Sequence, residues 1–362
     1  MSKKNDEKMM RHCIELAKKG TGYVSPNPLV GAVIVKDGKI ISEGYHKKFG
    51  SSHAEINAIN SAKRKGLDLK NSTMYVNLEP CSHFGKTAPC VDSIIKNKFS
   101  KVVIGTRDPN PLVSGKGINK LKKNNVIVRE GILKKECTGL NKFFFKFIRT
   151  GLPYITIKSA QTSDGFIADK NHKSKWISSI ESRRLVHKFR NEYDAALVGK
   201  NTVGHDNPSL TVRHIKGRSP YRIVIDKKLS LGLNKKIFSD NLRDRTIIIS
   251  SNTADKNKIK LFSQKNIEII FSEIKKNKID LKEAVKKIGK LGIMSILVEG
   301  GGYTFSEFIK QKIVDELLVF ISPKIMGKGI KGIDIEKQLG RKNYKNISYE
   351  FIVRDILLRI KL

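Results

Sequence analysis

The sequence has no long hydrophobic run and few cysteines. No apolar stretch among its 362 residues approaches the roughly 18 residues that a membrane-spanning helix needs. The start, MSKKNDEKMM, is charged and lacks the apolar segment of a signal peptide. Four cysteines do not make a disulfide framework in a chain of this length, and cytosolic cysteines more often bind metals or pack in cores. These absences predict a cytoplasmic protein with no membrane partner.

Acidic residues are also scarce, with 34 Asp and Glu against 71 Lys and Arg, for a formal net charge of +37. A charge of this size can mark a nucleic-acid-binding protein. The lysines, however, are spread over loops, helix faces and turns, and they accompany Asn and Ile rather than Arg and exposed aromatic residues. We interpret the charge as a compositional bias that leaves a solvated basic surface, and we expect no nucleic-acid partner.

The first half of the chain has the pattern of a mixed α/β domain. The segment VGAVIVKDGKIISEGYH predicts a hairpin of two apolar strands, joined by Asp37 and Gly38, a favoured tight-turn pair. Helices are expected at about 53–65 and 89–97, with a last helix over 133–148 that carries a phenylalanine cluster.

The second half restarts the pattern. Gly151 and Pro153 interrupt the chain, and a new apolar strand begins at Tyr154. We therefore divide the chain into two α/β domains, residues 1–148 and 149–362, because its length exceeds the usual size of one compact domain. Strands in the second half alternate with helices, which favours a largely parallel sheet; the helices are expected near residues 179–192, 255–264, 280–291 and 303–312.

Three residues in the first half have the types and order of a metal site. His53 stands at an expected helix start, and Cys81 and Cys90 lie in LEPCSHFGKTAPC. Zinc favours nitrogen and thiolate ligands, and a catalytic zinc keeps one of its four positions for water. Glu55, two residues after the histidine, can take a proton from that water without binding the metal. Alternatively, the cysteines are small buried side chains and His53 is a helix cap.

The order of these residues favours the metal site. An H-x-E segment followed by Pro-Cys and a second cysteine is the signature of zinc deaminases that act on nucleobases. The remaining cysteines, Cys13 and Cys137, lie within apolar helical patterns and are expected in the core. We therefore predict zinc at His53, Cys81 and Cys90, with Glu55 as the catalytic residue.

The two cysteines are separated by eight residues, SHFGKTAP, where most nucleobase deaminases have two. SPNPLVGAVIVKDGKIISEGYH, HAE, LEPCSHFGKTAPC and DPNPLVSGKG together resemble the deaminase half of the bifunctional riboflavin-biosynthesis deaminase/reductase family. The resemblance implies a cytidine-deaminase-like three-layer domain that removes an amine from a diaminopyrimidinone bearing a ribosylamino 5-phosphate. It also implies that Asn27, His46 and Lys86 contact this substrate. The alternatives are structural: Asn27 lies in a Pro-Asn-Pro turn, and Lys86 can be a solvated charge.

The second half resembles the reductase half of the same family. SAQTSDGFIA, SKWIS, LVGKNTVGHDNPSLTVR, RIVID and LVEGGG carry this resemblance, which implies a dihydrofolate-reductase-like domain that uses NADPH. The implied cofactor-binding residues are Ala160, Trp176, Thr202, Asp206, Gly301 and Gly302. The implied substrate-binding residues are Ser174, Arg190, Leu210, Arg213 and Glu299.

Residue chemistry is compatible with these roles. SILVEGGGYTFSEF is an apolar strand that leads through glycines into a helix, and such a turn lets backbone amides approach a phosphate. Arginines such as Arg190 and Arg213 offer paired donors to phosphate oxygens. Alternatively, Arg190 is one more basic helix residue and Trp176 packs in the core. Lys227 departs from the family pattern, because a small hydroxyl residue is expected after RIVID.

The sequence therefore predicts a bifunctional enzyme, a zinc deaminase followed by an NADPH-dependent reductase that converts the ribosyl chain to ribityl. Its partners are expected to be the small pyrimidine ribosylamine phosphate and further copies of the same chain. The competing hypothesis is a tRNA or nucleotide deaminase with an RNA-binding or non-catalytic C-terminal domain. The cysteine spacing and the lack of a platform of stacking aromatic residues argue against it.

Overall fold

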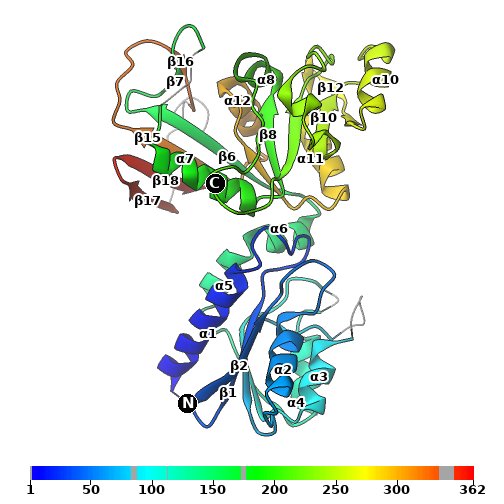
Figure 1. Ribbon diagram of the computed structural model, residues 1–362, viewed down its shortest axis with the longest axis vertical. Helices are drawn as coiled ribbons and strands as arrows, with labels where there is room; N and C mark the ends of the chain where they lie inside the picture. The colour runs from blue at the N-terminus through cyan, green and yellow to red at the C-terminus, as the bar shows by residue number, and fades with distance from the viewer. Residues whose placement is uncertain (1, 83–87, 112, 173–176, 334–345) are drawn as a thin grey trace. The chain divides into compact units, whose positions relative to one another are not determined.

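The computed structural model describes residues 2–82, 88–111, 113–172, 177–333 and 346–362. The chain divides into two compact units, Met1–Thr150 and Gly151–Leu362. The first unit is built from these elements, shown in Figure 1: α1 (Lys3–Lys18), β1 (Gly31–Lys36), β2 (Lys39–Tyr45), α2 (Ala54–Arg64), β3 (Thr73–Leu78), α3 (Cys90–Lys96), β4 (Lys101–Thr106), α4 (Lys116–Lys123), β5 (Ile127–Glu130), α5 (Lys134–Leu140) and α6 (Lys142–Thr150).

The first unit is a five-stranded sheet between two layers of helices. The strand order is β2-β1-β3-β4-β5, with β1 antiparallel to both of its neighbours and β3, β4 and β5 parallel. Helices α1 and α5 lie on one face, and α2, α3 and α4 lie on the other (Figure 1). The predicted hairpin is confirmed: Lys36 pairs with Lys39, and Asp37 and Gly38 have φ angles of 49° and 78°, as a type I′ turn requires. The three-layer prediction is likewise confirmed.

The helix predicted over residues 133–148 is wrong as a single element, because Asn141 interrupts it. Helix α5 ends before Asn141, and α6 begins after it. The Asn141 side chain is buried, where it accepts a hydrogen bond from the Leu29 N–H at 2.7 Å and donates one to the Leu29 carbonyl at 2.9 Å. These bonds fix the segment that leads into β1, at the expense of a continuous helix.

The second unit contains more strands than the first, and Figure 1 shows the larger of them. Its elements are β6 (Tyr154–Thr162), β7 (Phe166–Ala168), α7 (Ile180–Glu192), β8 (Ala195–Gly199), α8 (Lys200–Asp206), β9 (Tyr221–Ile225), α9 (Lys236–Ser239), η1 (Arg243–Arg245), β10 (Thr246–Ser250), α10 (Lys256–Gln264), β11 (Glu268–Phe271), β12 (Ile274–Lys275), β13 (Lys278–Ile279), α11 (Leu281–Lys290), β14 (Ser295–Val298), α12 (Gly302–Lys310), β15 (Glu316–Ser322), β16 (Ile330–Lys331), β17 (Ile347–Ile352) and β18 (Asp355–Lys361).

A nine-stranded sheet forms the centre of the second unit. Its order is β11-β10-β9-β8-β14-β6-β15-β18-β17, and the strands from β11 to β15 are parallel, while β18 and β17 are antiparallel additions. This confirms the prediction of a largely parallel sheet. Its central strands are almost wholly buried and packed by apolar side chains of α11 and α12, as parallel strands covered on both faces require.

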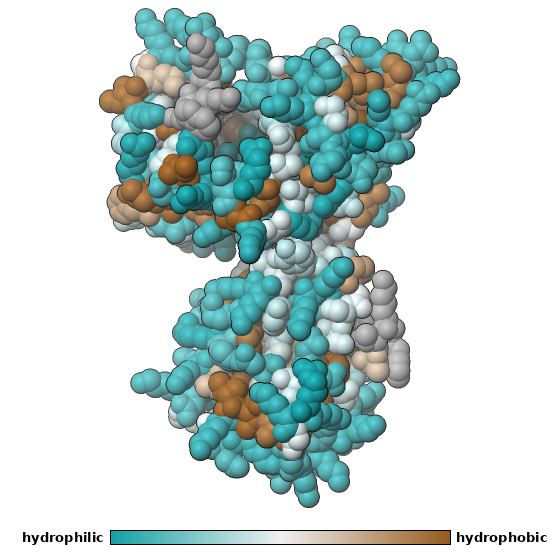
Figure 2. All heavy atoms as spheres, viewed as in Figure 1, coloured by the Kyte–Doolittle hydropathy of each residue, from teal (hydrophilic) through white to brown (hydrophobic). Residues whose placement is uncertain are grey.

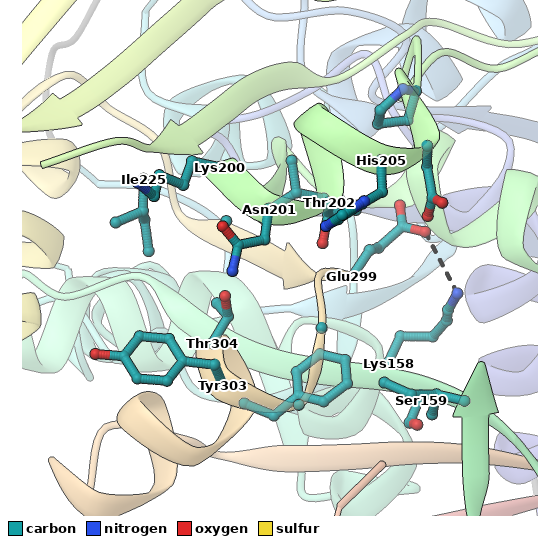
Figure 3. Close-up of a pocket in the computed structure, with 18 of the residues that line it drawn as sticks. Lys158, Ser159, Lys200, Asn201, Thr202, His205, Ile225, Glu299, Tyr303 and Thr304 are labelled. Carbon is teal, nitrogen blue, oxygen red and sulfur yellow. Dashed lines mark ion pairs between the residues drawn. The ribbon is translucent and has the colours of Figure 1, made fainter. Parts of the chain in front are cut away.

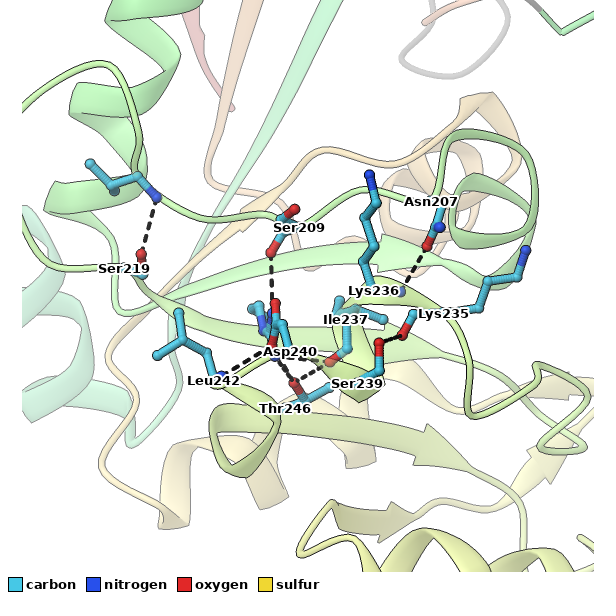
Figure 4. Close-up of polar contacts among 12 residues, drawn as sticks. Asn207, Ser209, Ser219, Lys235, Lys236, Ile237, Ser239, Asp240, Leu242 and Thr246 are labelled. Carbon is cyan, nitrogen blue, oxygen red and sulfur yellow. Dashed lines mark hydrogen bonds and ion pairs between the residues drawn. The ribbon is translucent and has the colours of Figure 1, made fainter.

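A buried arginine fixes the segment that follows β9. Arg222 is fully buried, and its guanidinium donates to both Asp240 carboxylate oxygens, to Thr246 Oγ1 and to the Ile237 carbonyl. Figure 4 shows Asp240, Ile237 and Thr246 gathered around this point. Because each polar group has a partner, the buried charge is compensated, and α9 is held against the ends of β9 and β10.

The surface is mainly hydrophilic. In the face shown in Figure 2, hydrophilic side chains cover most of both units, with hydrophobic atoms in smaller groups. Across the described ranges, no helix combines the length and hydrophobicity needed to cross a membrane.

Candidate functional site

The three predicted metal ligands converge in the first unit. His53 is the N-cap of α2, Cys90 is the first residue of α3, and Cys81 follows β3 by a few residues. The His53 Nδ1 atom lies 3.3 Å from Cys90 Sγ and 3.6 Å from Cys81 Sγ, and all three ligand atoms lie within 4.8 Å of one another. Residues far apart in sequence thus present one nitrogen and two sulfurs to a single point, the donor set that zinc prefers.

Hydrogen bonds to Cys81 favour its thiolate form. A hydrogen bond from the Cys90 thiol and another from His53 hold the pKa of Cys81 well below its ordinary value, although burial opposes them. The Cys90 backbone N–H also points at Cys81 Sγ, at 3.4 Å. Thiolates are the form in which cysteines bind metals, so the site is prepared for a cation.

Glu55 lies in the first turn of α2, beside the ligands. Its side chain is buried, and within the described part of the chain its Oε2 atom has no hydrogen-bond partner. Burial, with a smaller contribution from the charge of Cys81, raises the pKa of Glu55 to about 7. A carboxyl group with a pKa near neutrality can both accept and donate a proton at physiological pH. The unpaired oxygen therefore points to a ligand, water or substrate at this place.

Asn27 and His46 lie beside the same site. The His46 ring packs edge-on against His53, with 5.5 Å between ring centroids. His46 Nδ1 lies 3.1 Å from the Ser52 carbonyl, so Nδ1 carries the proton and Nε2 accepts from Asn27 Nδ2 at 3.1 Å. Burial lowers the pKa of His46, which favours the neutral ring. Both predicted substrate contacts therefore lie beside His53, while Lys86 lies outside the described residues.

Glu79 is a buried carboxylate that the motif analysis did not single out. It accepts hydrogen bonds from the backbone N–H groups of Gly115 at 3.0 Å and of Asp108 and Ile118, each at 3.3 Å. Glu79 precedes Pro80 and Cys81, so it fixes the DPNPLVSGKG segment against the chain that carries a metal ligand. Its place in the LEP-Cys motif was the only available signal, because its partners are backbone groups remote in sequence.

The second candidate site is a pocket of about 990 Å³ in the second unit. It lies at the carboxyl ends of parallel strands β8, β9 and β14, where open α/β sheets bind ligands. The predicted residues that line it are Ala160, Arg190, Thr202, Asp206, Leu210, Arg213, Glu299, Gly301 and Gly302. Ser174 and Trp176 lie outside the described residues.

A buried ion cluster forms one end of this pocket. Both Glu299 carboxylate oxygens bind the Arg190 guanidinium, at 2.6 Å and 2.9 Å, and the Lys158 ammonium lies 3.5 Å away (Figure 3). Burial acts to raise the pKa of Glu299, but the charges of Arg190 and Lys158 prevail and lower it to about 2. Burial lowers the pKa of Lys158, against the opposing effect of Glu299. Glu299 is therefore ionised, beside a lysine whose pKa is lowered by burial.

Lys158 was missed in the sequence, although it is the one charged residue of YITIKSA, an otherwise uncharged and largely buried strand. A lysine is almost never buried unless it is paired, and that contrast was the signal that could have identified it. Arg190 also differs from expectation in its partner. The Arg190 guanidinium donates to Glu299 and to the Thr211 carbonyl at 3.2 Å, so few of its N–H groups remain to bind a phosphate.

Arg213 is better placed to bind an anion. Among the described residues its guanidinium has no carboxylate partner, and burial together with the nearby charge of Arg190 lowers its pKa. Its backbone N–H donates to His187 Nδ1 at 3.2 Å, and burial, with the charge of Arg190, lowers the pKa of His187 to about 4. His187 is thus a neutral acceptor that fixes the backbone of Arg213.

The glycine turn after β14 brings backbone close to this pocket. Gly301 has a φ of 20° and is the N-cap of α12. A Cβ on Gly300 would lie 2.8 Å from the Val198 Cα, so any side chain there would collide with β8. The turn therefore presents backbone N–H groups where a bulkier sequence could not, as in the binding of nucleotide phosphates.

Comparisons with known proteins place both halves of the chain in known families. Residues 3–106 match the cytidine and deoxycytidylate deaminase zinc-binding region, and residues 153–357 match the RibD C-terminal domain. The riboflavin biosynthesis protein RibD of Aquifex aeolicus is 40% identical over 361 residues, which cover 98% of this chain and 99% of that protein. RibD of Actinobacillus pleuropneumoniae is 41% identical over 359 residues, covering 96% and 93%.

Solved structures agree as well. The crystal structure of a diaminohydroxyphosphoribosylaminopyrimidine deaminase/5-amino-6-(5-phosphoribosylamino)uracil reductase from Thermotoga maritima has a TM-score of 0.89 at 40% identity and covers 99% of each chain. RibD of Acinetobacter baumannii has a TM-score of 0.87 at 31% identity, also covering 99% of each chain.

The fold and the two sites together define a bifunctional enzyme, a zinc-dependent deaminase joined to a reductase with a pocket for a nucleotide cofactor. The first unit has the cytidine-deaminase-like fold, and the second has the dihydrofolate-reductase-like fold of RibD reductases. The chain belongs to the RibD family of riboflavin-biosynthesis enzymes.

Proposed function

We propose that the chain catalyses two consecutive reactions on one pyrimidine ribosylamine phosphate. The first is the hydrolytic deamination of 2,5-diamino-6-ribosylamino-4(3H)-pyrimidinone 5′-phosphate. The second reduces the ribosyl chain of that product with NADPH and gives 5-amino-6-ribitylamino-uracil 5′-phosphate. The convergence of His53, Cys81 and Cys90 beside Glu55, whose Oε2 atom has no hydrogen-bond partner among the described residues, carries the proposal for the first step. The buried Glu299 cluster in a pocket of cofactor size supports the second.

In the first step, zinc held by His53, Cys81 and Cys90 would supply the Lewis acidity that makes a water molecule nucleophilic near neutral pH. Glu55 accepts the proton of that water through its free Oε2 atom and passes it to the amine, which leaves as ammonia. The neutral His46 ring holds the Asn27 side chain by accepting from Asn27 Nδ2, and the rest of the Asn27 amide can orient the pyrimidine beside Glu55.

In the second step, the nicotinamide of NADPH would supply a hydride to C1 of the opened ribosyl chain. Opening the sugar ring requires a proton on the ring oxygen as its bond to C1 breaks. Lys158 can donate that proton, because burial lowers its pKa. Glu299, held ionised by Arg190, accepts hydrogen bonds from sugar hydroxyls, and the guanidinium of Arg213, which has no carboxylate partner in the described part of the chain, binds the 5′-phosphate.

Removal of zinc tests this assignment of the two steps to separate sites. We expect chelator-treated protein to release no ammonia from the diaminopyrimidinone substrate, and to recover this activity when zinc is returned. The same zinc-free protein should still oxidise NADPH when it is given the deaminated product, because the candidate metal group found among the described residues consists of His53, Cys81 and Cys90 and does not include Glu299. Ammonia release that persists without zinc would contradict the proposed deaminase site.

A further inference from the structure

The two cysteines of the metal site are not held together by a short covalent link. Eight residues separate Cys81 from Cys90, whereas the Cys-x-x-Cys spacing of most nucleobase deaminases keeps both thiols within one turn of chain. A link of this length can span roughly 30 Å when it is fully extended. The covalent connection therefore does not set the distance between the two thiols, and tertiary contacts have to set it.

Helix α4 takes the acceptor at its N-terminus from another element. Its N-cap is Gly115, which has no side chain, and its first turn, residues 116–118, contains no acidic residue. Glu79, which follows β3, supplies the missing acceptor. Its Oε2 atom accepts from the Gly115 N–H at 3.0 Å, and its Oε1 atom accepts from the Ile118 N–H at 3.3 Å. The carboxylate thus satisfies free donors of the helix and complements the positive end of its dipole.

The capped end of α4 packs against both segments that carry the cysteines. A Cβ at Gly117 would lie 2.3 Å from the Pro80 carbonyl oxygen and 3.4 Å from Val91 Cγ2. The backbone of α4 therefore lies directly against the residue before Cys81, and beside the residue after Cys90.

Two further contacts join these segments to one another. An ion pair between Asp92 and Lys120 links α3 to α4, and the Val91 N–H donates to the Cys81 carbonyl at 3.2 Å. Since Glu79 stands directly before Pro80 and also caps α4, one carboxylate connects the segment that leads to Cys81 with the helix that supports α3.

We infer that Glu79 is a positioning residue, which sets the spacing of Cys81 and Cys90 through α4 and thereby the affinity for zinc. This inference rests on the proposed zinc site and deepens it. Glu79 is buried, and its carboxylate binds backbone groups rather than the metal. Without this acceptor, α4 loses its cap and its support against Pro80 is weakened. Residues that orient metal ligands typically contribute about 10–100-fold to metal affinity or activity.

Zinc titration of Glu79→Gln, in competition with a chromophoric chelator, tests the inference without any catalysis. The glutamine keeps the shape of the side chain, but an NH₂ group that cannot accept replaces one of the two oxygens. The dissociation constant for zinc is expected to rise about 10-fold or more. With cobalt(II) in place of zinc, the visible absorption bands report the geometry of the ligands. We expect these bands to shift, which a loss of stability alone would not produce.

Asp6→Asn is the matched control for lost stability. Asp6 is also a buried carboxylate of the first unit, but it accepts from the Tyr75 hydroxyl at 2.7 Å and from Arg129 at 2.6 Å, on the side of the sheet that α1 covers (Figure 1). This variant should lower the thermal unfolding temperature and leave zinc affinity and the cobalt bands unaltered. A zinc affinity of Glu79→Gln within twofold of the wild type, or an equal loss in Asp6→Asn, would overturn the inference.

Gly117→Ala tests the same contact with Glu79 intact, so the outcome does not depend on the folding of Glu79→Gln. The added Cβ would collide with the Pro80 carbonyl and displace α4, and zinc affinity should again fall. Gly139→Ala is its control, because a Cβ at this exposed glycine of α5 would meet nothing within 4 Å among the described residues. Undiminished zinc affinity in Gly117→Ala would contradict positioning by α4. A wild type that binds no zinc would instead reject the proposed metal site, and this inference with it.

Discussion

Glu55→Gln is expected to keep its zinc and to lose deamination, with a rate at least about 100-fold below the wild type and up to about 10⁴-fold below it. The glutamine preserves the shape and burial of the side chain beside the metal ligands, but it cannot accept a proton. Because the metal ligands are His53, Cys81 and Cys90 and do not include Glu55, the affinity for zinc should change little. Ammonia release and zinc content, measured on the same preparation, check both parts of this prediction.

The matched control for this variant is Glu15→Gln, which makes the same change on the exposed face of α1. It should leave both zinc content and ammonia release unaltered. If Glu55→Gln lost its zinc as well as its activity, Glu55 would be needed to hold the metal, and its assignment as the proton carrier would be wrong. Undiminished deamination would have the same consequence.

Arg190→Ala is expected to reduce NADPH oxidation by about 30-fold or more while deamination continues at the wild-type rate. Removal of one partner from a buried charge pair costs about 2–5 kcal/mol, much of it from the charge left unpaired. Here Glu299 would lose the fork that holds it at 2.6 Å and 2.9 Å and retain only Lys158 at 3.5 Å. The carboxylate would then lose its fixed orientation toward the sugar.

Since an unpaired buried charge also weakens folding, the conservative variant Arg190→Lys is needed beside the alanine. Lysine keeps the positive charge but cannot make the bidentate contact, so its reduction rate should fall while the thermal unfolding temperature is largely retained. Arg243→Ala, at an exposed position, controls for loss of a basic residue. If deamination and reduction fell equally in Arg190→Ala, the two sites would not be independent.

The metal centre could be predicted from the sequence because its chemistry is concentrated in two short motifs. His53 and Glu55 share one helix start, and Cys81 and Cys90 stand at the two ends of one short sequence segment, so residue type and order already indicate zinc. The support of these motifs could not be predicted in the same way. Glu79 accepts hydrogen bonds from backbone N–H groups of residues 108–118, and a backbone donor cannot be identified from residue type because almost every residue has one.

The reductase pocket shows the opposite balance. Its strands and helices follow from their hydrophobic patterns, and nine of the expected site residues do line one pocket. The pairing of those residues was not predictable, because Arg190, Glu299 and Lys158 come from three separate elements. The sequence predicted that Arg190 binds a phosphate, whereas in the structure Arg190 binds Glu299, and Arg213 has no carboxylate partner among the described residues. Local patterns predict elements well, but the partner of a charge depends on which elements meet.

The most direct test of the two-reaction account is a single time course on the purified full-length protein with zinc bound. The diaminopyrimidinone ribosylamine phosphate and NADPH are supplied together, and ammonia and NADPH absorbance are followed separately. The account predicts that ammonia appears first, that NADPH is consumed after a lag, and that both reach equal amounts. NADPH consumption that precedes ammonia release, or the absence of both signals, would contradict it.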